Sequence, residues 1–143
     1  MQDESIKLLW ECNSGCKMAI KSMNQVREFV SNPELAKLIE KSKEKHQKLE
    51  EETSHKLADA HMEEKEPGVM ASAFSWISTE IKMVMKECDN KIAKIMMDGC
   101  NMGIQSISEK MNEWKHADEE SRLVANKLID EEESFMKQLK AYL

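Results

Sequence analysis

The sequence predicts an all-α protein with a single domain. Its 143 residues include only 4 glycines and 2 prolines, and 34% of them are charged, a composition typical of helices. Apolar residues recur three and four positions apart through most of the chain, as they do in amphipathic helices. A chain of this length can bury one sizeable core and is too short for two, so we expect one domain over residues 1–143.

The first two predicted helices meet at a proline. The helical period of apolar residues holds through residues 3–30 and predicts a first long helix there. Pro33 suits the first turn of a second helix, and Asn32 suits its N-cap. We expect the second helix to extend to about Glu64, because a Glu-Pro-Gly sequence at 66–68 then breaks the pattern.

A shorter helix and a third long helix are predicted next. Apolar spacing indicates the shorter helix over residues 69–85, and Asp89 could cap a long helix that extends to about Trp114. A rival break lies at Asp98–Gly103, since two glycines in a helix interior each cost roughly 1 kcal/mol relative to alanine. The sequence leaves open which of the two positions breaks the chain.

The last long helix completes a set of four that match in length. Asp118 or Ser121 can cap it, and Val124, Leu128 and Phe135 share one of its faces. At 1.5 Å per residue each long helix spans roughly 40 Å, so the four can pack side by side as a four-helix bundle.

The arrangement of these helices resembles the ferritin-like superfamily, in which a long connection returns along a four-helix bundle. The shorter helix over 69–85 would be this crossover helix, between the second and third long helices. More narrowly, four sequence runs are similar to an uncharacterised family of small bacterial ferritin-like proteins. They are Asn-Pro-Glu-Leu from residue 32, Lys-Glu-Pro-Gly from 65, Met-Ala-Ser-Ala-Phe-Ser-Trp-Ile-Ser from 70 and Asp-Gly-Cys-Asn-Met-Gly-Ile from 98. The resemblance implies a ferritin-like fold in a bacterial cytosolic protein.

Two Glu-x-x-His motifs, Glu52–His55 and Glu113–His116, carry the ligand spacing of di-iron carboxylate bundles. Successive residues turn about 100° around a helix, so each side chain can be placed relative to the apolar stripe. Both histidines fall far from the stripe, Glu52 lies about 100° away and Glu113 lies at its margin. We therefore expect both motifs to face solvent.

The same construction places two other polar residues inside the bundle. His46 lies near the centre of the second helix's apolar stripe, and Glu132 near the centre of the last helix's stripe. A carboxylate buried alone is costly, so we expect Glu132 to meet His46 across the bundle. The resemblance implies that these two match one histidine and one glutamate of the di-iron pattern, from which Lys43 and Phe135 depart. The sequence leaves two roles open for these residues: a buried polar pair that fixes helix register, or a metal or redox site.

Cys12 and Cys16 form the other candidate cluster, since they lie one turn apart on the apolar face of the first helix. Two such thiols can chelate Cu(I) or Zn(II), and the 12 methionines of the chain would suit Cu(I). The alternative is that both cysteines simply fill the core, as buried cysteines often do.

A possible interface is predicted on the shorter helix. Val69, Trp76 and Met83 repeat at intervals of seven and form a second apolar stripe beside the one that would dock on the bundle. Exposed tryptophan in such a stripe is typical of interfaces, so we expect a homodimer or a protein partner there. The alternative is that the stripe packs under neighbouring loops.

Composition and motifs exclude several function classes. The net charge is -6 with acidic and basic residues interleaved, so neither nucleic acid nor a membrane surface is an expected partner, and the N-terminus has no apolar signal region. No phosphate loop or nucleophile elbow is found. The sequence predicts a cytoplasmic, non-enzymatic interaction or structural protein with no cofactor. The alternative is a metal-binding or redox bundle that holds iron, copper or zinc through His46, Glu132, Cys12 and Cys16.

Overall fold

The computed structural model describes residues 3–64 and 88–143, and these residues form helices without any strand. The all-α prediction is therefore confirmed for this part of the chain. The helices are α1 (Asp3–Arg27), α2 (Pro33–Asp59), α4 (Asp89–Glu113) and α5 (Glu119–Leu139), followed by a 3-10 turn, η1 (Lys140–Tyr142).

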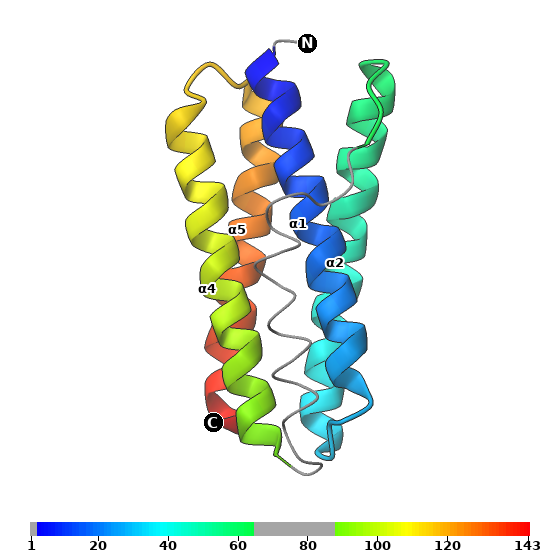
Figure 1. Ribbon diagram of the computed structural model, residues 1–143, viewed down its shortest axis with the longest axis vertical. Helices are drawn as coiled ribbons and strands as arrows, with labels where there is room; N and C mark the ends of the chain where they lie inside the picture. The colour runs from blue at the N-terminus through cyan, green and yellow to red at the C-terminus, as the bar shows by residue number, and fades with distance from the viewer. Residues whose placement is uncertain (1–2, 65–87) are drawn as a thin grey trace.

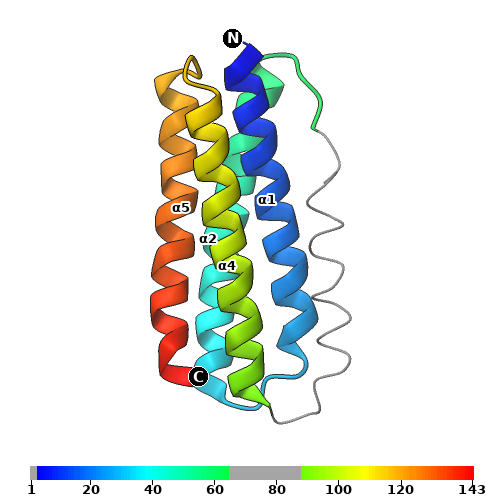
Figure 2. The ribbon, with the colours of Figure 1, turned by 60° about the vertical axis from the view of Figure 1, so that its left-hand side comes forward.

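The four α-helices pack side by side as a bundle (Figure 1). α1 packs most extensively on α2, and α4 packs most extensively on α5, with further contacts of α5 to α1 and α2. α2 and α4 run in the same direction, so α2 ends at the opposite end of the bundle from the start of α4 (Figures 1 and 2). The predicted crossover helix, 69–85, lies outside the described residues, so the ferritin-like connection stays a prediction.

Two helices begin at a predicted N-cap residue, and in both the side chain of that residue accepts a hydrogen bond from a nearby backbone N–H. Asn32 Oδ1 accepts a hydrogen bond from the backbone N–H of Glu34 at 2.8 Å, with Pro33 in the first turn of α2. Asp118, and not its rival Ser121, is the N-cap of α5, and its carboxylate accepts from the Ser121 N–H at 2.8 Å.

The predicted ends of α1 and α2 were wrong by three to five residues, since α1 ends at Arg27 and α2 at Asp59. His61, with a φ of 58°, turns the chain out of α2. The residues beyond it then dock on α1, where Trp10 Nε1 donates to the Glu63 carbonyl oxygen at 2.8 Å. The apolar periodicity of the sequence does not reveal a helix end that is set by such a turn.

α4 corrects two further expectations. It continues through Gly99 and Gly103, so the rival break at Asp98–Gly103 is wrong. Its N-cap is Cys88 and not Asp89. The Asp89 carboxylate instead accepts hydrogen bonds from the backbone N–H groups of Ser31 and Asn32, both at 2.9 Å, and ties the α1–α2 loop to the start of α4.

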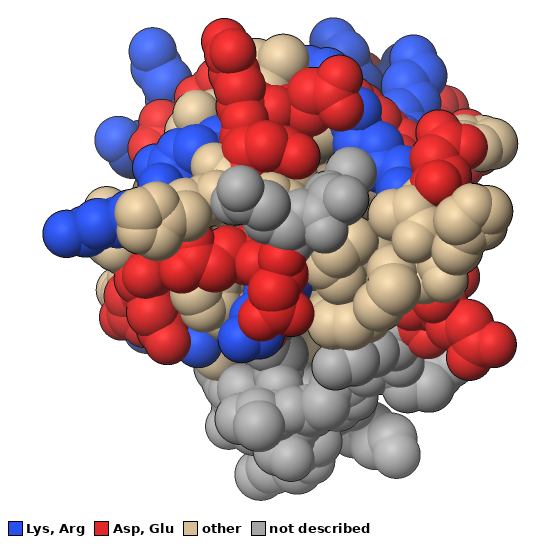
Figure 3. All heavy atoms as spheres, turned by 90° about the horizontal axis from the view of Figure 1, so that it is seen from above, with Lys and Arg blue, Asp and Glu red and all other residues tan. Residues whose placement is uncertain are grey.

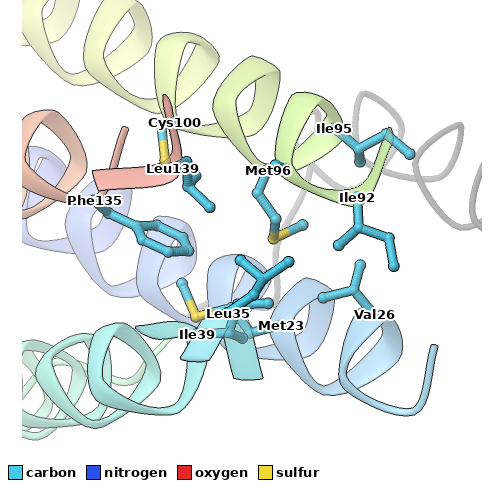
Figure 4. Close-up of a cluster of buried hydrophobic side chains, with 11 residues drawn as sticks. Met23, Val26, Leu35, Ile39, Ile92, Ile95, Met96, Cys100, Phe135 and Leu139 are labelled. Atoms are coloured by element: carbon cyan, nitrogen blue, oxygen red, sulfur yellow. The ribbon is translucent and has the colours of Figure 1, made fainter. Parts of the chain in front are cut away.

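The apolar core consists of two main clusters that lie along the bundle. Figure 4 shows the first, to which all four α-helices contribute; it includes Ile39 of α2 and Phe135 of α5. The second includes Leu49 of α2 and Leu128 of α5. The stretch of each helix between the two clusters is therefore the middle of the bundle.

Asp89→Ala should lower the free energy of unfolding by about 1–2 kcal/mol, because two backbone N–H groups lose a charged acceptor. Urea unfolding measures the change. Asp98→Ala is the matched control, since Asp98 is an exposed carboxylate on the same helix, and it should shift stability by less than about 0.5 kcal/mol. Equal effects of the two substitutions would contradict the role given to Asp89.

Candidate functional site

His46 and Glu132 meet in the middle of the bundle, between the two apolar clusters. Both are buried, with 0% and 7% of their surface exposed, and His46 Nε2 is hydrogen-bonded to Glu132 Oε1. The other ring nitrogen, Nδ1, lies 2.7 Å from the backbone carbonyl oxygen of Ser42. A carbonyl oxygen can only accept, so Nδ1 carries a proton and Nε2 faces the carboxylate.

The surroundings of His46 favour its charged form. Burial by itself lowers the pKa of the imidazole, but the hydrogen bond that the ring donates to Glu132 and the charge of that carboxylate outweigh burial, so the pKa of His46 is raised. An imidazolium that donates from both nitrogens satisfies the Ser42 carbonyl and the Glu132 carboxylate together. The site is therefore a buried ion pair between α2 and α5.

A second carboxylate joins this pair to the surface. Glu131 Oε1 accepts from the Ser42 hydroxyl at 3.0 Å, and Glu131 Oε2 lies 3.4 Å from the Lys45 ammonium. Ser42 thus contacts both His46 and Glu131, and Lys45 supplies a solvent-facing counter-charge. Glu131 is not predicted from the sequence, because it lies beside the apolar stripe of α5 and is covered only where α2 packs against it.

Thiols from the two remaining helices approach Glu132. Burial raises the pKa of the Cys100 thiol on α4, and the charge of Glu132 and a hydrogen bond with it raise that pKa further. Burial is also the largest cause that raises the pKa of Cys16 on α1, followed by Cys12 and Glu132. These thiols are protonated at neutral pH. Cys100 lies on the apolar stripe of α4, which is the signal that could have identified it.

A cavity of about 40 Å³ lies beside this polar layer, between α1, α4 and α5. Glu132 and Cys100 line it, and so do Gly15, Gly99 and Gly103, which carry no side chain to fill it. A Cβ added to Gly103 would lie 3.7 Å from Oε2 of Glu132, so this oxygen faces the glycine side of the cavity.

The structure brings only part of the predicted metal set together. Cys12 is buried in the second apolar cluster, and the groups that perturb its thiol do not include Glu132, so it does not join His46 and Glu132. Among the described residues, no three His, Cys, Asp or Glu side chains are grouped as they would be to hold one ion. The four-residue set His46, Glu132, Cys12 and Cys16 is therefore not one site, because its members face different layers of the core.

Lys43 and Phe135 stand where the ferritin-like pattern would require further metal ligands, and neither supplies a ligand beside His46 and Glu132. Lys43 forms an ion pair with Glu40 at 3.5 Å, and Phe135 is fully packed in the first apolar cluster. Lys43 therefore belongs to a surface ion pair, and Phe135 belongs to the apolar core.

Both Glu-x-x-His motifs face outward, as predicted. His55, Glu113 and His116 are exposed, and the half-buried Glu52 pairs with Lys127 at 3.2 Å. Neither motif points into the bundle, so neither can supply inward-facing ligands. The predicted interface residues Val69, Trp76 and Met83 lie outside the described part of the chain.

The charged surface is mixed in sign at the end of the bundle that carries the start of α1. Figure 3 shows acidic and basic side chains side by side on this end. No helix in residues 3–64 and 88–143 is both long and apolar enough to cross a membrane.

Comparison with known proteins finds no matching family model, no matching curated protein and no matching solved structure. The resemblance to small bacterial ferritin-like proteins therefore stays a prediction from the sequence.

The ion pair predicts that stability depends on pH with a definite sign. Because the pKa of His46 is raised on folding, the folded protein keeps a proton that the unfolded chain releases above about pH 6.5. The stabilisation is therefore complete below that pH and is lost as the pH rises through the folded-state pKa. Glu132→Gln removes the charge of the carboxylate, so wild type and variant should differ most near pH 6 and progressively less at alkaline pH. Urea unfolding over a pH series measures this difference, and one that grows with pH would contradict the ion pair.

Proposed function

We propose that the protein is a cytoplasmic, non-enzymatic helical bundle that acts as an interaction or structural protein. One observation carries the proposal: the buried imidazole and carboxylate, the groups best suited to catalysis or metal binding, are hydrogen-bonded to each other in the core. Both nitrogens of His46 and Oε1 of Glu132 take part in these hydrogen bonds, and His46 has no exposed surface. Their role is then to hold α2 and α5 in one register.

The energy of a buried charge makes the pair sensitive to helix register. If α2 shifted by one residue against α5, the imidazole and the carboxylate would both be left unpaired in an apolar layer. A misaligned bundle is therefore disfavoured by several kcal/mol, even if its apolar surface were buried equally well. Such a pair selects one packing arrangement and presents one fixed outer surface to a partner.

Leucine substitutions at the pair test this role. His46→Leu and Glu132→Leu should each lower the free energy of unfolding by about 3–5 kcal/mol, because each leaves a buried partner unpaired. The double variant should be much more stable than the sum of the two changes implies, since no unpaired group remains. Urea unfolding at pH 7 gives the coupling.

The outward motif supplies a control with the same residue types. Glu52→Leu, His55→Leu and their double variant should each change stability by less than about 1 kcal/mol, because exposed pairs contribute little. Additive losses at His46 and Glu132, without coupling, would sink the proposed structural role.

The proposed partner surface is the second apolar stripe predicted for residues 69–83, and its most favoured partner is a second copy of the chain. Its support is the sequence spacing of Val69, Trp76 and Met83. Trp76→Asp should halve the mass measured by light scattering, because a buried charge at the centre of an interface is costly. His55→Asp, at an exposed position of α2, should leave the mass unchanged. If wild type is already monomeric at high concentration, the homodimer is wrong.

The alternative function, a metal-binding bundle, is favoured by a separate observation. Cys100 and Glu132 both line the cavity between α1, α4 and α5, so the interior has a space with a thiol and a carboxylate at its wall.

A further inference from the structure

The cavity beside the polar layer gathers three sulfur-bearing side chains. Met23 of α1 and Met96 and Cys100 of α4 line it, and each is at most 5% exposed. Figure 4 shows these three side chains directed from their helices into the core. The cavity of about 40 Å³ exceeds the roughly 10–15 Å³ that a single water needs, so it has room for a particle of that size.

The donor atoms of this space match one class of ion. Thiolate and thioether sulfurs are soft ligands that select Cu(I), whereas Mg²⁺ and Ca²⁺ require several oxygen ligands. Glu132, the one carboxylate among the described residues that line the cavity, already pairs with His46. Methionine side chains have three rotatable bonds, so Met23 and Met96 can turn their sulfur atoms onto an ion in the cavity.

We propose that this cavity is a Cu(I) site, in which the Cys100 thiolate and the thioethers of Met23 and Met96 hold one ion. Binding replaces the thiol proton of Cys100 by Cu⁺, and the proton leaves to solvent. The charge of the buried layer is therefore the same before and after binding, with imidazolium and carboxylate unchanged. A divalent ion bound in the same way would add one uncompensated charge to an apolar core, which disfavours Zn²⁺.

The glycines explain why the space exists. Gly99 and Gly103 lie on α4 on either side of Cys100, and a Cβ at Gly103 would project toward Glu132. Helix interiors disfavour glycine by roughly 1 kcal/mol relative to alanine, so keeping the cavity lowers the stability of α4. This site differs from the Cys12–Cys16 pair predicted from the sequence, because neither of those cysteines lines the cavity. It also goes beyond the proposed structural role, which depends on His46 and Glu132.

Anaerobic titration of the reduced 143-residue chain with Cu(I), in competition with bicinchoninate, tests the proposal. We expect one ion per chain and one proton released per ion. Cys100→Ser should weaken binding more than about 100-fold, beyond the 10–100-fold typical of changes around a metal site, and Met96→Leu about 10-fold. Cys88→Ser is the matched control, because Cys88 precedes α4 and does not line the cavity, and it should bind as wild type does.

Two variants keep the test decisive if Cys100→Ser fails to fold. Met96→Leu nearly conserves volume, and Gly103→Ala has room for its methyl group but reduces the cavity; both should retain helical circular dichroism and bind Cu(I) more weakly. Less than one ion per chain would overturn the proposal. So would loss of binding in a Cys12→Ser, Cys16→Ser double variant together with retained binding in Cys100→Ser. None of these results would alter the His46–Glu132 coupling, which is measured without copper.

Discussion

Burying an imidazole against a carboxylate in the middle of a helical bundle constrains every other part of the packing. His46 and Glu132 can only be buried together, because either one alone would be an uncompensated polar group in an apolar core. Their contact fixes the height of α2 relative to α5. The two main apolar clusters, to which all four helices contribute, lie on either side of this pair.

The same layer determines what the interior can do chemically. Burial, together with the negative charge of Glu132, raises the pKa of the Cys100 thiol and keeps it protonated, so this thiol is a poor nucleophile. A soft monovalent ion can nevertheless replace the thiol proton without changing the net charge of the layer. The buried pair and the sulfur-lined cavity are therefore neighbours with separate proposed roles: the pair holds the helices in register, and the cavity offers a space for a ligand.

Helix identity and the central pair could be predicted from the sequence because both depend on local periodicity. Asn32 and Asp118 cap their own helices with their own side chains, and the period of 3.6 residues places His46 and Glu132 on inward faces. Asp89 was misassigned because its carboxylate bonds to the loop between two other helices. A residue whose partners lie about 57 positions away gives no periodic signal in its own helix.

Local periodicity was enough to predict that the described chain is helical, that the two Glu-x-x-His motifs face outward, and that His46 and Glu132 face inward. The packing of the helices against one another is what brings Cys100, and not Cys12, to Glu132, and leaves a cavity beside the glycines of α4. Helical periodicity gives the direction in which a side chain points around the axis of its helix. The height at which it meets a neighbour depends on how separate helices slide against one another, and here the buried ion pair sets that height.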